Sequence, residues 1–139
     1  MFGSLDVSTS ALTAQRAVLD TIAGNIANAY ATRGPNGEPT PYRRRVALLG
    51  TGDPNRGQDA PGVHVVKVAE DPSPFRLEYD PTHPDAIKEG KEKGYVRMPN
   101  VDYSTEMVNA MLASRVYEAN ITVMEATKSM AAASLRLLA

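Results

Sequence analysis

The sequence of 139 residues contains no cysteine, so the fold uses neither a disulfide nor a thiolate metal site. It has no uninterrupted apolar run of about 18 residues, so it predicts no membrane-spanning helix and no direct membrane insertion. The first residues lack the basic start and the continuous apolar core of a secretory signal, and we expect no cleaved signal peptide. The formal net charge of −1 gives no overall field that attracts nucleic acid. These absences favour a single domain without a nucleic-acid partner.

Helix-breaking residues are missing from the two ends of the chain. All ten prolines lie between residues 35 and 99, and most glycines and charged residues lie in the same middle part. The sequence therefore divides into an N-terminal helix over 1–32, an extended, β-rich, Pro/Gly-rich middle segment over 33–101, and a C-terminal helix over 102–139. The predicted fold class is mainly α with a small β element.

The C-terminal stretch repeats apolar residues every seven positions. Asp102 is suited to be the N-cap, and Glu106 and Arg136 suit the two ends of the helix dipole. The two series lie three and four positions apart, which places them on one helical face. They are Asn109, Val116, Val123, Met130, Leu137 and Leu112, Ala119, Ala126, Ala133, with Tyr117, Met124 and Ala131 beside them.

The N-terminal stretch carries a similar stripe. We expect its helix to start within 6–10 and to end within 29–32, and we interpret Gly24 as a point where a neighbouring backbone approaches closely. The two stripes predict an antiparallel, coiled-coil-like pair of terminal helices. The C-terminal stripe is longer, so its uncovered part is expected to bind another chain. The stripe consists of Leu5, Leu12, Leu19 and Ile26, with Ala11, Val18, Ile22 and Ala29 on the same face.

The middle segment predicts four short strands. Apolar and polar residues alternate within 63–68 and 75–79, the stretch 42–49 is strand-like, and 95–98 is a last short extended piece. Turn residues separate these stretches. So few short strands form a small antiparallel sheet or a hairpin, which is marginal alone and needs the helices or another subunit to cover it.

No group of residues in the sequence indicates catalysis. Residues 43–45 are three consecutive arginines. Because the middle segment is balanced in charge, they do not indicate nucleic-acid binding. We interpret them as a solvated strand edge or as a source of subunit salt bridges. His64 and His83 lie in different segments, and the prolines around His83 favour a turn over a metal site. Glu118 and Glu125 lie on the polar side of the helix, where acidic residues are normally solvated. We expect no enzyme activity, no catalytic or metal-binding residue and no cofactor.

Several motifs nevertheless resemble one family. Residues Ala23–Ala29 and the preceding Ser10–Arg16 resemble the N-terminal motif of bacterial flagellar axial proteins, the rod and hook subunits. Residues Ala113–Asn120 are similar to the second motif of that superfamily. Residues Tyr79–Ala86 and Gly94–Asp102 resemble its basal-body rod proteins in particular. The likeness extends over nearly the whole chain, with local departures at 46–61 and 87–93.

This resemblance implies a structural subunit of the proximal rod, the hollow drive shaft that transmits torque across the periplasm. It implies helical assembly with copies of the same chain and with other rod proteins, of the FlgB, FlgF and FlgG types and the FliE type at the base. It also implies export from the cytoplasm by the flagellar type III apparatus. The alternatives are another flagellar axial subunit, a rod–hook adaptor or, more distantly, an exported cell-wall-remodelling enzyme.

The residues expected to have a functional role are those of the assembly interface. Amides beside an apolar stripe must find partners there and can fix the register of packing. The predicted interface residues are Leu5, Leu12, Leu19, Ile22, Asn25, Ile26, Asn28, Leu112, Val116, Tyr117, Asn120, Val123, Met124, Met130 and Leu137.

Overall fold

The computed structural model describes residues 2–52 and 61–138, with a long helix at each end and a small β region between them. The prediction of a mainly α chain with a small β element is therefore confirmed. The strand boundaries differ from those expected by a few residues, except for the last strand. The elements are α1 (Phe2–Ala27), β1 (Arg45–Thr51), β2 (Val63–Glu70), β3 (Arg76–Tyr79), β4 (Tyr95–Met98) and α2 (Tyr103–Leu138).

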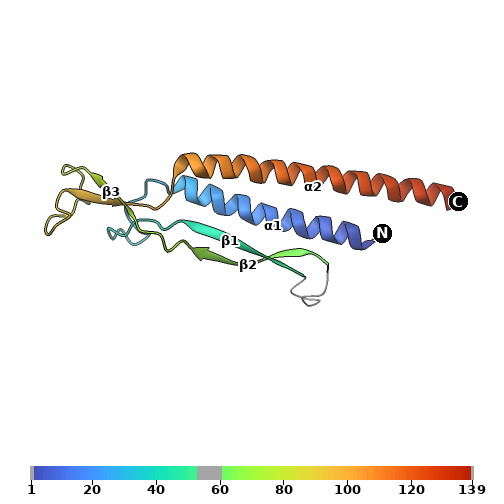
Figure 1. Ribbon diagram of the computed structural model, residues 1–139, viewed down its shortest axis with the longest axis horizontal. Coiled ribbons are helices and arrows are strands. Elements are labelled where there is room, and N and C mark those ends of the chain that lie inside the picture. Colours follow the sequence, from blue (N-terminus) through green and yellow to red (C-terminus); the bar gives the residue numbers. More distant parts are fainter. Residues whose placement is uncertain (1, 53–60, 139) are drawn as a thin grey trace.

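The elements form three layers, with α1 in the middle (Figure 1). On one side α1 packs against α2, and on the other against the β1–β2 ribbon. The start of α1 and the end of α2 lie at the same end of the molecule, where α2 extends past α1 (Figure 1). At about 1.5 Å per residue, the 36 residues of α2 make a rod of about 54 Å, against about 39 Å for the 26 residues of α1.

Because α1 is covered on two sides, the most exposed of its described positions form a narrow stripe. Its exposed positions recur three and four residues apart. They are Gly3, Asp6, Thr9, Thr13, Arg16, Asp20, Ala23 and Ala27.

The face of α2 that packs on α1 differs from the most apolar stripe in its sequence. Its buried and half-buried positions include small and polar residues such as Ala113 and Glu106, whereas Val116 and Val123 are 47% and 54% exposed. Small side chains allow the two helices to approach closely, which explains why this less apolar face was selected. The positions of this face are Glu106, Ala110, Ala113, Tyr117, Asn120, Met124, Thr127, Ala131 and Ser134.

The four strands pair as two separate antiparallel ribbons, β1 with β2 and β3 with β4. The β1–β2 register runs from Arg45 opposite Glu70 to Thr51 opposite Val63, with an irregularity between Leu48 and Leu49. The β3–β4 ribbon lies past the end of the helix pair (Figure 1). Its last cross-strand pair is Tyr79 with Tyr95. Their rings meet edge to face with centroids 5.2 Å apart.

The helix ends confirm one expectation and correct two. Asp102 caps α2 as predicted: its Oδ1 accepts the backbone N–H groups of Ser104 at 2.9 Å and Thr105 at 3.3 Å. However, α1 begins at Phe2 and ends at Ala27, earlier than expected at both ends. The interpretation of Gly24 is wrong, because the atom nearest to an added Cβ there is the Tyr42 hydroxyl oxygen, a side-chain atom at 3.9 Å.

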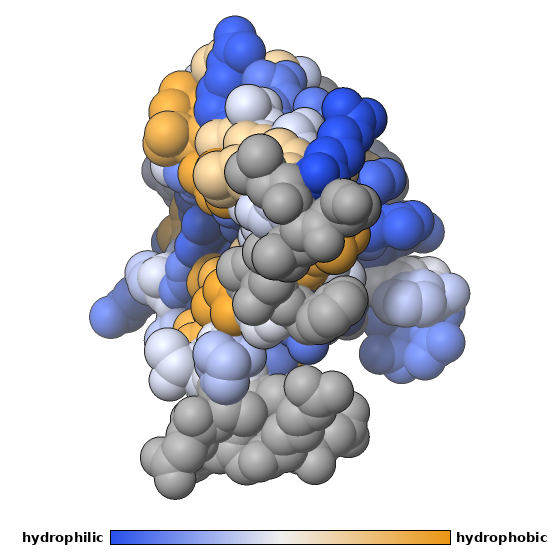
Figure 2. Space-filling view, turned by 90° about the vertical axis from the view of Figure 1, so that its right-hand side faces the viewer, coloured by the Kyte–Doolittle hydropathy of each residue, from blue (hydrophilic) through white to orange (hydrophobic). Residues whose placement is uncertain are grey.

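The hydrophobic core is small for a chain of this length. Among the described residues, the fully buried apolar side chains are mostly short, and many larger ones remain in contact with solvent. Figure 2, seen from the end at which α2 finishes, shows hydrophobic side chains exposed between hydrophilic ones. The isolated chain therefore leaves much apolar surface uncovered. The buried apolar residues are Ala14, Ile22, Ala29, Val96, Val101 and Ala113.

Candidate assembly surface and the buried polar cluster

A polar cluster joins both helices to the start of β1. Glu106, in the first turn of α2, is only 1% exposed. Its Oε1 accepts the Nε and Nη2 groups of Arg44 at 2.9 and 2.8 Å, and its Oε2 accepts Nδ2 of Asn25 at 2.9 Å. A buried carboxylate is tolerated when it is paired and hydrogen-bonded, and Glu106 meets both conditions.

The Asn25 side chain forms two hydrogen bonds with the backbone of β1, as a neighbouring strand would. Its Nδ2 donates to the carbonyl oxygen of Arg45 at 2.8 Å, and its Oδ1 accepts the Arg45 N–H at 2.9 Å. The same Oδ1 accepts the Tyr42 hydroxyl at 3.1 Å. The predicted need of this amide for a partner is thus met within the chain, where it fixes β1 to α1.

Arg44 extends the cluster to the segment before α2. Its backbone N–H donates to Oδ1 of Asn100 at 2.8 Å, and its Nη1 lies 3.2 Å from Oδ2 of Asp71. Burial alone lowers the pKa of Arg44, but the hydrogen bond and the charge of Glu106 outweigh it, so the pKa is raised overall. The prediction of a solvated edge or subunit salt bridges is wrong for Arg44, which pairs inside its own chain.

A second ion pair anchors the loop between β3 and β4. Asp85, whose side chain is 8% exposed, lies 2.7 Å from Nη2 of Arg33 and accepts the Thr32 hydroxyl at 2.9 Å. The Arg33 guanidinium holds the pKa of Asp85 below its usual range. This contact ties the loop to the segment that follows α1.

The stripe predicted from heptads forms an exposed strip on α2, which we call the flank of α2: Leu112, Val116, Val123 and Met130. Their exposed fractions run from 47% to 63%. Leu112 and Val116 also line a groove of about 300 Å³ together with Val18 and Ile22 of α1 and Val46 of β1. The groove is also lined by polar residues such as Gln15 and Asn109. Leu112 and Val116 join it to the flank, whose apolar side chains the chain itself leaves about half exposed.

The structure divides the predicted interface residues between inside and outside. Ile22 and Asn25 are buried within the chain, and the flank of α2 is exposed. Asn28 donates its side-chain amide to the Gly24 carbonyl oxygen at 2.8 Å. Leu137 lies outside the residues whose side chains are described. The half-buried remainder consists of Leu5, Leu12, Leu19, Ile26, Tyr117, Asn120 and Met124.

The histidines and acidic residues considered for chemistry lie apart from one another. His64 has its Nδ1 3.0 Å from the Gly52 carbonyl oxygen, while His83 lies beside Asp85 in the distant β3–β4 loop. Glu118 pairs with Arg115 on the exposed side of α2. Across residues 2–52 and 61–138, no three side chains gather as a potential metal site.

Glu106 was predicted only to suit the helix dipole, and its buried pairing with Arg44 and Asn25 was not predicted. One signal was present: Glu106 lies seven positions before Ala113 and fourteen before Asn120, in the series that faces α1.

Neither described helix is long and apolar enough to cross a membrane.

Two family models match the two ends of the chain. Residues 5–35 match the model described as flagella basal body rod protein, and residues 92–137 match the C-terminal model of the flagellar basal body rod FlgEFG proteins. The first match covers most of α1 and the first part of the connector, and the second covers β4 and nearly all of α2.

Curated relatives match over nearly the whole chain. The flagellar basal-body rod protein FlgC of Borreliella burgdorferi is 42% identical, over 99% of this chain and 97% of its own length. FlgC of Bacillus subtilis is 44% identical, over 98% and 97%. FlgC of Salmonella typhimurium is 44% identical, over 95% and 93%. The chain therefore belongs to the FlgC family of flagellar basal-body rod proteins and is a structural subunit of the flagellar rod.

Proposed function

We propose that this subunit forms part of the proximal rod and assembles helically, through its terminal helices, into the hollow shaft that transmits torque across the periplasm. One observation carries the proposal: Leu112, Val116, Val123 and Met130 line the flank of α2, yet the chain's own elements leave them about half exposed. A shaft that carries torque needs each subunit to bury apolar surface against several neighbours. Repeated contacts between unlike surfaces that do not close build a helical filament.

In this proposal the terminal helices act as an antiparallel, coiled-coil-like pair. The steps of three and four residues along the α1-facing side of α2 support it, as does the hydrogen bond from Nε2 of Gln15 to the Ala113 carbonyl oxygen at 3.3 Å. The pair, 1–32 with 102–139, forms the rod core, and the segment 33–101 packs outside it. Buried side chains such as Ile22 and Asn25 hold the pair together, and the exposed members of the predicted interface contact other subunits.

The neighbours in this proposal are copies of the same chain and the other rod proteins, of the FlgB, FlgF and FlgG types, with the FliE type at the base. The chain reaches its place through the flagellar type III export apparatus, without a cleaved signal. It works as a non-enzymatic structural part, which is supported by the rod proteins among its relatives.

A charge placed on the flank of α2 tests the proposal. Val123 is 54% exposed, so Val123→Asp changes the stability of the free chain by less than about 0.5 kcal/mol. In an interface the same aspartate buries an unpaired charge, which costs several kcal/mol. We expect cells that carry Val123→Asp to lack complete rods and to be non-motile.

The matched control is Thr122→Asp, which adds the same charge one residue away, on the polar side of α2 near Glu118 and Glu125. Rod assembly and swimming should persist in this variant. Normal swimming with Val123→Asp would show that the flank of α2 is not an interface.

A further inference from the structure

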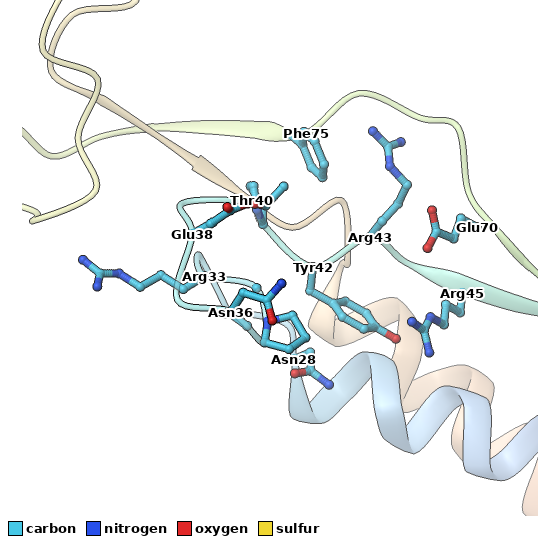
Figure 3. A pocket seen from close by; sticks show the side chains of 14 residues that line it. Asn28, Arg33, Asn36, Glu38, Thr40, Tyr42, Arg43, Arg45, Glu70 and Phe75 are labelled. Atoms are coloured by element: carbon cyan, nitrogen blue, oxygen red, sulfur yellow. The ribbon is translucent and has the colours of Figure 1, made fainter.

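We propose that the pocket beside the start of β1 binds an acidic peptide segment of a neighbouring rod subunit; this inference rests on the proposed function, since it assumes assembly. The pocket has a volume of about 770 Å³, within the range of ligand-binding clefts. It lies between the connector after α1, the start of β1, the end of β2 and Phe75 (Figure 3). We call it the arginine pocket, after Arg43 and Arg45.

The backbone of Arg45 is fixed, but its charge is unmatched. Both backbone hydrogen bonds to Asn25 hold the residue in place. Its guanidinium carbon lies 5.6 Å from the centre of the Tyr42 ring, which orients the side chain over the aromatic face. Glu70 is its cross-strand neighbour in the register, yet within the described part of the chain Arg45 forms no ion pair with it or with another carboxylate.

The Arg43 side chain is also held in place, by an aromatic ring and by two backbone carbonyl oxygens. Its guanidinium carbon lies 4.4 Å from the centre of the Phe75 ring, and its Nη1 donates to the carbonyl oxygens of Asp71 at 2.9 Å and Ser73 at 3.1 Å. Carbonyl oxygens satisfy the N–H groups without neutralising the charge. Within residues 2–52 and 61–138, neither guanidinium group forms an ion pair with a carboxylate, and both groups line one cavity.

Within the described part of the chain, Arg43 and Arg45 differ from the other arginines because both lack a carboxylate partner and both line this pocket. Arg16, Arg76 and Arg136 also form no ion pair there, but they do not line the pocket. Four other arginines each have a carboxylate within 3.2 Å: Arg33, Arg44, Arg97 and Arg115. The planar guanidinium matches a carboxylate with two parallel hydrogen bonds, so an incoming Asp or Glu is the group that best completes the pocket.

The rest of the lining favours a peptide over a nucleic acid. Glu38 and Glu70 also border the pocket and are exposed to solvent. A phosphate chain carries a negative charge on every unit and would bring several charges near these two glutamates, whereas a peptide with one acidic side chain brings a single negative charge, directed at the arginines. The faces of Phe75 and of the prolines Pro35 and Pro41 offer apolar contact for an extended segment. A segment with one acidic side chain directed at Arg43 and Arg45 satisfies both features.

The test uses a strain that lacks the gene and expresses variants of the full chain. Arg45→Glu should lower the number of completed rods per cell by at least about tenfold, the effect of opposing a charge that pairs across an interface. Arg45→Gln, which adds no repulsion toward Glu70, should lower it by a smaller factor. The matched control is Lys91→Glu, which makes the same charge change on the exposed β3–β4 loop and should leave the number unchanged.

Selection for restored swimming from Arg45→Glu then identifies the partner. We expect suppressors that change Asp or Glu to Lys or Arg in another rod subunit. Wild-type rod numbers in both Arg45 variants would overturn the proposal, and so would suppressors that change only Glu38 or Glu70. If the Arg45 variants assemble normally while Val123→Asp blocks assembly, only the pocket proposal fails and the structural role stands.

Discussion

Replacing Glu106 by alanine removes the carboxylate at the centre of the buried polar cluster. The change leaves the Arg44 guanidinium without its main partner and the Nδ2 group of Asn25 with one acceptor instead of two. Removing one member of a buried ion pair typically costs 3–5 kcal/mol. Arg44 retains Asp71 at 3.2 Å, and its side chain is 26% exposed, so we expect the low end, about 3 kcal/mol.

Thermal unfolding of the purified chain, followed by circular dichroism, measures this loss. For a chain of this size, about 3 kcal/mol corresponds to a decrease in Tm of about 9 °C. Glu106→Gln retains the shape and one acceptor oxygen, so its Tm should lie between those of the wild type and Glu106→Ala.

Glu118→Ala is the matched control, since it removes a glutamate that also pairs with an arginine on α2. The Arg115–Glu118 pair is 2.9 Å long, but its side chains are 81% and 62% exposed. Such surface pairs contribute less than about 0.5 kcal/mol. If Glu106→Ala and Glu118→Ala lowered the Tm equally, the cluster would not hold the layers together.

Two further predictions concern stability. Gly24→Ala should raise the Tm by the equivalent of about 0.5–1 kcal/mol, because an added Cβ meets only the Tyr42 hydroxyl at an ordinary 3.9 Å; a lower Tm would show that α1 needs the glycine. Hydrogen bonds from Ser73 and Arg33 lower the pKa values of Asp71 and Asp85, respectively, in the folded state. The two ionised carboxylates therefore stabilise the fold at pH values above the unfolded pKa of about 3.9. This contribution to the free energy of unfolding is lost as the pH falls through the folded pKa values. The Tm, measured from pH 7 to pH 3, should fall steeply only below about pH 4, and less steeply in Asp85→Asn; equal slopes in both would contradict this account.

The sequence predicted the elements better than it predicted the contacts between them. Asp102 as a cap and strand 95–98 follow from local rules, because a cap and a short extended stretch depend on neighbouring residues. The face of α2 that meets α1 could not be read from hydrophobicity, because Ala113 and Glu106 pack there while Val116 faces outward. Close packing of small side chains decided that choice.

The polar cluster was also beyond a local reading. Glu106 bonds to Arg44, which lies 62 positions earlier, and to Asn25, which lies 81 positions earlier. No periodicity relates a helix residue to one partner just before a strand and to another in a distant helix. Asn25 was correctly expected to require a partner, but only the layered arrangement shows that β1 supplies it.

The central claim is that the flank of α2 lies between subunits in the assembled rod. The chain has no cysteine, so Val123→Cys introduces a single reactive thiol. The measurement is the rate of maleimide labelling of this thiol in the free chain and in purified basal bodies. The account predicts rapid labelling in the free chain, where Val123 is 54% exposed, and strong protection in the basal body. Equal rates in the two states would contradict it.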